Sequence, residues 1–106
     1  MTKIDKVKFL KSLNTLPFPV AHTVFLEEQT APYLIYTCED YTLTAANSVT
    51  IMEQTEIVLE LYTDPGQTDS AEDILETFLH DFTTYEKARS YITEEKLYVT
   101  YYTFDL

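Results

Sequence analysis

Hydrophobic and polar side chains alternate along residues 55–63, which read TEIVLELYT. In an extended chain Ile57, Leu59 and Leu61 point to one side, and the residues between them point to the other. The β-branched and aromatic residues of this stretch suit a pleated surface, and the Asp-Pro-Gly sequence that follows ends it. The pattern predicts a half-buried strand at the centre of a small sheet.

Two other stretches have apolar side chains at the three-to-four-residue spacing of amphipathic helices. One helix is predicted over residues 2–14, because Pro17 and Pro19 stop it from continuing. Another is predicted over residues 69–82, with Asp69 or Ser70 as its N-cap. The apolar stripes consist of Ile4, Val7, Phe9, Leu10 and Leu13 in the first helix and of Ile74, Leu75, Phe78, Leu79 and Phe82 in the second.

Four further strands are predicted at about residues 20–27, 32–38, 85–93 and 96–104, from runs of β-branched and aromatic residues. A short polar turn separates the first two, so these are predicted to form a hairpin. Residues 39–47 are polar and predicted to be a loop, and a weaker strand signal centres on residues 49–51.

The order of these elements predicts an α+β fold in a single domain, residues 1–106. The connections have hairpin length, so the sheet is expected to be mostly antiparallel. We expect the N-terminal helix and the central helix to pack on this sheet, and a β-hairpin to form the C-terminal part.

Charge is distributed unevenly along the chain, whose net charge is −11. Lys3, Lys6, Lys8 and Lys11 lie near the N-terminus, whereas the chain from Ser12 onward has three basic and 17 acidic residues. This acidic part of the chain is expected to repel nucleic acid, because phosphate contacts need basic side chains. The acids could serve solubility, form a wall that DNA passes without sticking, or imitate DNA.

Reactive residues are sparse and lie in no recognisable catalytic motif. Cys38 is the single cysteine, so an internal disulfide is impossible and a reducing compartment is expected. His22 and His80 have neither the spacing of zinc ligands nor the context of a catalytic triad. With Gly66 as the single glycine, a glycine-rich phosphate loop cannot form. We therefore expect no enzymatic activity, cofactor or metal, and no membrane span or signal peptide.

Several stretches resemble small proteins from the head–tail modules of phages and prophages of Gram-positive bacteria. EIVLELYTD (residues 56–64), AEDILETFL (71–79) and YEKARSYITEEKLYVTYYTFDL (85–106) carry the resemblance, which is strongest over residues 56–64 and 91–104. LPFPVAH (16–22) and PYLIYTCED (32–40) extend it upstream. These relatives are head–tail joining or tail-completion proteins, also described as tail-terminator-like proteins.

The resemblance implies a structural virion protein that acts by assembly and is made in the cytoplasm of the bacterial host. Its subunits would form a ring, commonly a hexamer, between the tail-tube protein and the head connector, and DNA would pass through without specific binding. A small acidic inhibitor that imitates DNA and binds a nucleic-acid enzyme is the alternative. The candidate contacts with other subunits or partners are Lys3, Lys6, Lys8, Lys11, Tyr62, Asp64, Tyr98 and Tyr102.

Overall fold

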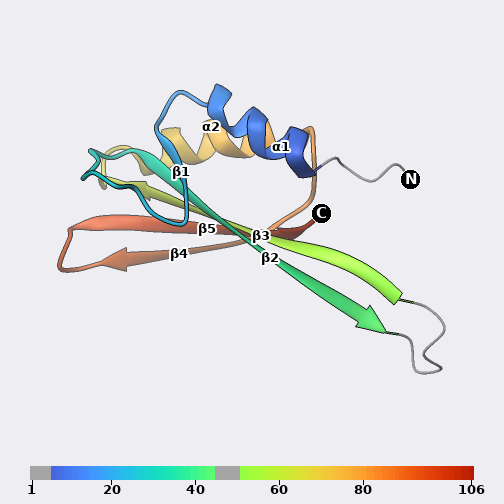
Figure 1. Ribbon diagram of the computed structural model, residues 1–106. Coiled ribbons are helices and arrows are strands. Elements are labelled where there is room, and N and C mark those ends of the chain that lie inside the picture. The colour runs from blue at the N-terminus through green and yellow to red at the C-terminus, as the bar shows by residue number, and fades with distance from the viewer. Residues whose placement is uncertain (1–5, 45–50) are drawn as a thin grey trace.

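Two layers, one of helices and one of strands, make up the computed structural model, which describes residues 6–44 and 51–106. In these residues a five-stranded sheet carries two α-helices on one face (Figure 1). The strand order is β1-β2-β3-β5-β4, and neighbouring strands are antiparallel except for β1 and β2. The predicted α+β class, with its mostly antiparallel sheet and both helices, is confirmed.

The described elements have the following bounds: α1 (Lys6–Ser12), the 3₁₀ turn η1 (Leu13–Thr15), β1 (Val20–His22), β2 (Tyr33–Thr44), β3 (Ile51–Thr63), α2 (Thr68–His80), β4 (Glu86–Ile92) and β5 (Leu97–Asp105). Residues 2–5 of the first predicted helix lie outside the described part of the chain. The second helix begins one residue and ends two residues earlier than predicted. Its N-cap is Gln67, which makes no side-chain capping bond, so the predicted cap at Asp69 or Ser70 is wrong.

The core lies between the helices and the sheet. Ile57, Leu59 and Leu61 of β3 are completely buried there, as their alternation predicts. Around the Phe9 ring of α1 lie the rings of Phe78, Phe82 and Phe104, with centroids 6.0, 5.2 and 5.5 Å away. This aromatic cluster joins both helices to β5.

Both predicted helical stripes are too wide. Val7 is 57% exposed and Ile74 is 41% exposed, although both were assigned to the apolar faces. In α1 the buried anchor is Phe9, and in α2 the buried positions Leu75 and Leu79 are four residues apart. The helices therefore present narrower faces to the sheet than the spacing alone suggested.

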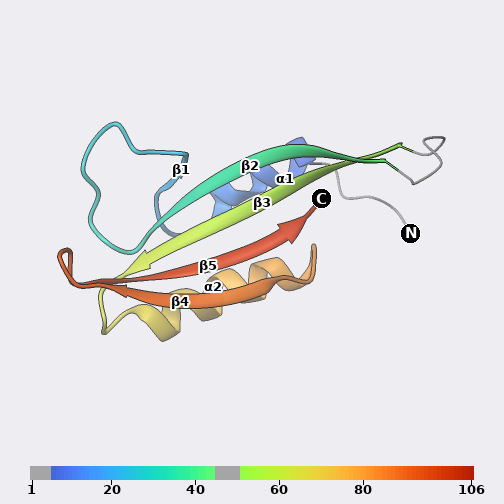
Figure 2. The same ribbon diagram turned by 90° about the horizontal axis from the view of Figure 1, so that it is seen from below.

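The predicted hairpin of residues 20–27 and 32–38 is wrong. β1 has only three residues and pairs with β2 in parallel, with Val20 opposite Leu34. The strand stops because Thr23 has a φ of 71°, a left-handed conformation that is rare for a β-branched residue. The chain then leaves the sheet edge and returns through a long loop, residues 23–32 (Figure 2).

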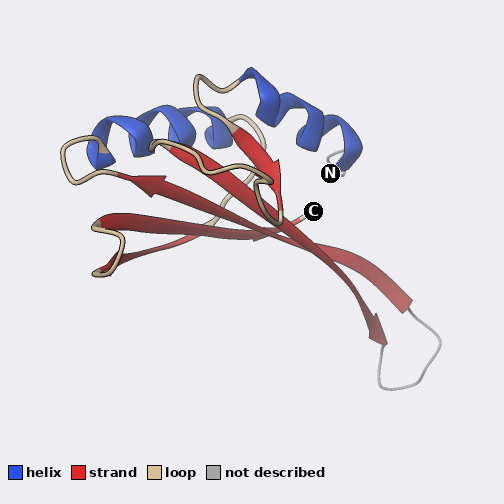
Figure 3. Ribbon diagram, turned by 60° about the vertical axis from the view of Figure 1, so that its left-hand side comes forward, coloured by secondary structure: helices blue, strands red, loops and turns tan. Residues whose placement is uncertain are grey.

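Residues 39–44 are strand and not the predicted loop. β2 and β3 continue as a pair up to Thr44 and Ile51, whereas β5 ends at Asp105, opposite Glu56. Beyond this point residues 41–44 and 51–54 form a two-stranded arm that projects from the body (Figures 1 and 3). Most of the weak strand signal predicted around residues 49–51 lies outside the described residues.

Candidate functional site

The two faces of the sheet differ in what covers them. Both helices lie behind the sheet when the molecule is viewed from below (Figure 2), so in the described residues no helix covers the near face. We call this near face the open face. The strand registers place these residues of the four long strands on it: Tyr33, Ile35, Thr37 and Glu39; Glu56, Val58, Glu60 and Tyr62; Leu97, Val99, Tyr101, Thr103 and Asp105; Ala88 and Ser90.

Aromatic rings and carboxylates dominate the chemistry of the open face. Tyr62 stacks on Tyr33 with ring centroids 4.9 Å apart, and its hydroxyl donates a 2.7 Å hydrogen bond to Glu60. Burial, followed by this bond to a carboxylate, raises the pKa of Tyr62. None of the residues on the open face as defined above is basic, so this surface is suited to a partner that brings cations.

A row of three carboxylates crosses the open face near the arm. Glu39, Glu56 and Asp105 lie opposite one another on β2, β3 and β5. Directly opposed like charges in a sheet are destabilising. The row therefore does not help the fold, and its place on an uncovered surface favours a role in recognition or solubility.

On the covered face the acidic residues are instead neutralised by bases from β4. Glu72 of α2 is 4% exposed and accepts hydrogen bonds from Arg89 Nε at 2.9 Å and Nη2 at 2.6 Å. Thr100 Oγ1 donates a further bond at 2.6 Å, and Lys87 Nζ lies 3.0 Å from the same carboxylate. Lys87 also donates to Glu76 at 2.8 Å. These contacts hold α2 on β4 and β5.

The pKa of Glu72 reflects this arrangement. Burial by itself would raise it, but the hydrogen bonds from Arg89, Thr100 and Lys87 outweigh burial and lower the pKa from 4.5 to about 2. The side chain therefore stays ionised at neutral pH with its acceptors used. A carboxylate so fully bonded is poorly suited to general acid or base catalysis, and its role is to hold the fold.

The reactive residues do not converge. His22 stacks on Tyr36 with centroids 4.8 Å apart, and His80 lies edge-on to Tyr85 at 6.5 Å. Cys38 is a half-buried free thiol whose pKa is raised by burial, the opposite of an activated nucleophile. Within residues 6–44 and 51–106, no group of three or more histidine, cysteine or acidic side chains could hold a metal ion.

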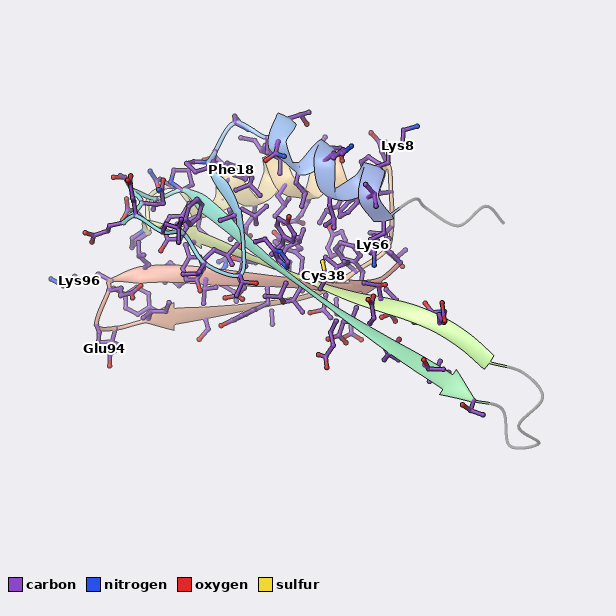
Figure 4. The ribbon with its side chains drawn as sticks, in the orientation of Figure 1. Lys6, Lys8, Phe18, Cys38, Glu94 and Lys96 are labelled. Carbon is purple, nitrogen blue, oxygen red and sulfur yellow. The ribbon has the colours of Figure 1, made fainter. Side chains whose placement is uncertain are left out.

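The lysines predicted as contacts lie on or before α1. Lys3 lies outside the described residues, whereas Lys8 and Lys11 are exposed. Lys6 points toward the sheet, and its Nζ lies 3.3 Å from Asp40 of β2, while Lys8 points away (Figure 4). Because their side chains are exposed, Lys8 and Lys11 are accessible for contacts with another molecule.

The predicted tyrosine and aspartate contacts are divided between the two faces and a loop. Tyr62 lies on the open face, and Asp64 is exposed in the loop after β3. Tyr98 is half-buried on the covered face beside Tyr91, with centroids 4.9 Å apart. Tyr102 is completely buried and donates a 2.8 Å hydrogen bond to Glu76. Tyr102 was therefore wrongly predicted as a contact, because the helix-facing side of β5 is part of the core.

One surface was not predicted, because residues 20–27 were assigned to a strand. In the loop after β1, Val24 is 61% exposed and Leu26 is 98% exposed. Phe25 between them packs edge-on against Tyr33, with centroids 5.6 Å apart. The signal was the run of three consecutive apolar residues, which does not alternate and is followed by two glutamates.

Comparison with protein-family models, with curated proteins and with solved structures finds no match to this chain. The resemblance to phage tail-completion proteins therefore stays a prediction. Neither helix in residues 6–44 and 51–106 is both long and apolar enough to cross a bilayer.

Proposed function

We propose that this chain is a structural subunit of a phage tail, a tail-terminator or tail-completion protein that assembles into a ring and joins the tail tube to the head connector. The observation that carries the proposal is the open face, a surface of tyrosines, aliphatic side chains and carboxylates that no helix of the described residues covers. Tyrosine-rich surfaces of this kind are typical of protein–protein contacts.

The arm adds support for an assembly role. A two-stranded ribbon is marginally stable by itself in water, and this one extends past the end of β5. Its root is held by Asp40, which accepts hydrogen bonds from Thr55 Oγ1 at 2.6 Å and from Lys6 Nζ at 3.3 Å. A neighbouring subunit that packs on the arm would supply the contacts that the body of its own chain does not.

The acidic balance fits a protein that DNA passes. A wall of carboxylates repels the phosphate backbone, whereas a basic wall would bind it and slow its passage. Few basic residues follow α1 in the sequence, and two of them, Lys87 and Arg89, are paired with carboxylates of α2.

The imitation of DNA has less support. A DNA mimic needs its carboxylates on one continuous surface that follows the phosphates. Here they are divided among the open face (Glu39 and Glu56), the outer side of α2 (Asp69 and Asp73) and the β4–β5 turn (Glu94). The separation favours assembly over imitation.

The proposal is tested with the purified full chain and the tail-tube protein of the same phage. We expect light scattering to give a discrete multiple of the 12.3 kDa chain, and electron microscopy to show the protein at one end of assembled tubes. A chain that stays monomeric and does not associate with tubes would refute the proposed function.

A further inference from the structure

The long loop after β1 and the end of the open face line a groove of about 410 Å³. Phe25 of the loop, Tyr33 and Ile35 of β2 and Leu97 of β5 supply its apolar lining. Leu26 and Val24 stand exposed beside it. An exposed concentration of aliphatic and aromatic side chains of this kind marks an interaction surface.

The rim of the groove is acidic. Glu27, Glu28 and Glu95 line it together with the apolar residues. Burial raises the pKa of Tyr33, and the charges of Glu95 and Glu28 raise it further. Lys96, which follows Glu95 in the β4–β5 turn, is the basic residue nearest to these glutamates in the sequence. An occupant that fits this groove has an apolar side chain with cations on either side of it.

The outer side of α1 has this chemistry. Val7 is 57% exposed, and Lys8 and Lys11 are exposed beside it. Positions 7 and 11, and positions 8 and 11, are neighbours on a helix surface because they are four and three residues apart. α1 has three lysines and no acidic residue.

The two surfaces lie at opposite ends of one chain. Lys8 lies at the end of the body where α1 begins, whereas Glu94 and Lys96, in the turn beside the groove, lie at the other end (Figure 4). The body with its arm extends 51 Å along its longest axis. The helix therefore does not reach the groove of its own chain, so a contact between these two surfaces joins two copies of the chain.

We propose that the groove formed by Phe25, Tyr33, Ile35 and Leu97 receives the Val7–Lys8–Lys11 side of α1 from a second copy of this chain. The contact joins two different patches, so it is heterologous and propagates from subunit to subunit until it closes as a ring. It rests on the proposed function, because a ring needs a contact of this type, and it assigns that contact to particular residues.

The test reverses the charge of each surface in the full chain. Glu27→Lys with Glu28→Lys makes the rim basic, and Lys8→Glu with Lys11→Glu makes the helix acidic. Each pair places like charges together, so we expect the association measured by sedimentation to weaken by about tenfold or more. A one-to-one mixture of the two variants, or all four changes in one chain, restores opposite charges at every contact and should restore association.

Asp73→Lys with Asp81→Lys is the matched control for the rim variant, because it adds the same charge at exposed positions in α2 and at its C-cap. We expect this variant to associate as the unmodified chain does, and circular dichroism to show that every variant folds. If the chain associates and neither reversal weakens it, or if the mixture fails to restore association, the inference is wrong while the proposed function stands. If the unmodified chain is monomeric, the inference is wrong, and binding to tail tubes then decides the proposed function separately.

Discussion

The covered and open faces of the sheet are built from the same strands and yet treat charge in opposite ways. On the covered face, Glu72 is buried and all its acceptors are used by Arg89, Lys87 and Thr100. On the open face, Glu39 and Glu56 lie opposite each other, and no base of that face neutralises them. The charged groups of the covered face thus hold α2 in place, whereas the opposed carboxylates of the open face destabilise the fold.

This difference indicates which side chains serve folding and which remain for contacts with other molecules. Side chains of the covered face are fixed by packing, so their replacement is expected to act on stability. Except for the buried Val99, side chains of the open face are half-buried or exposed, so their replacement is expected to act chiefly on association. Matched substitutions on the two faces of one strand test whether the covered face determines stability and the open face association.

The largest contrast is expected between Leu59→Lys and Val58→Lys, which are adjacent on β3. Leu59 is completely buried beneath the helices, so an ammonium group there is both desolvated and unpaired. We expect a loss of about 4 kcal/mol or more, enough to unfold a domain whose total stability is about 5–15 kcal/mol. Val58 lies between Glu56 and Glu60 on the open face, where a lysine is expected to change stability by less than about 1 kcal/mol.

Urea denaturation followed by circular dichroism measures both variants. Equal losses at the two positions would mean that the open face is packed as tightly as the covered one.

A second contrast concerns pH and the buried carboxylate. The pKa of Glu72 is 4.5 in its reference state and about 2 in the fold, so its contribution is complete above pH 4.5 and is lost as the pH falls through about 2. A shift of this size corresponds to about 3 kcal/mol. We expect Glu72→Gln to be less stable than the unmodified chain by about this amount at pH 7, and the two stability curves to converge near pH 2.

Glu60→Gln, on the open face, is the control for this experiment. Its curve should stay within about 0.5 kcal/mol of that of the unmodified chain at neutral pH. A Glu72→Gln curve that stays parallel to the unmodified one down to pH 2 would mean that the Arg89 and Lys87 contacts do not stabilise the ionised form.

The sequence predicted the covered face well, because burial of one face imposes a period of two. Ile57, Leu59 and Leu61 are all buried, and β4 and β5 lie within a residue of their predicted bounds. Where neither face is covered, as in the arm, this constraint disappears. Residues 39–44 therefore read as a polar loop, although they are paired strand.

The groove could not be predicted for a different reason. Its residues come from the loop after β1 and from β2 and β5, which are distant in sequence and meet only through the sheet order. β1 ends at the positive φ of Thr23, 71°, which no local sequence pattern predicts. Strand faces follow from local alternation, but a surface shared by a loop and two strands depends on topology.

The smallest contrast is expected between two tyrosine hydroxyls, one on each face. Tyr102 is completely buried, and its hydroxyl donates to Glu76 at 2.8 Å, so Tyr102→Phe removes a charge-assisted bond beneath α2. We expect a loss of about 1–2 kcal/mol. Tyr62 donates to Glu60 at 2.7 Å on the half-exposed open face, where water can replace the hydroxyl, so Tyr62→Phe should cost about 0.5 kcal/mol or less. Urea denaturation at pH 7 compares the two, and a loss at Tyr62 as large as that at Tyr102 would show that the open face also holds the fold together.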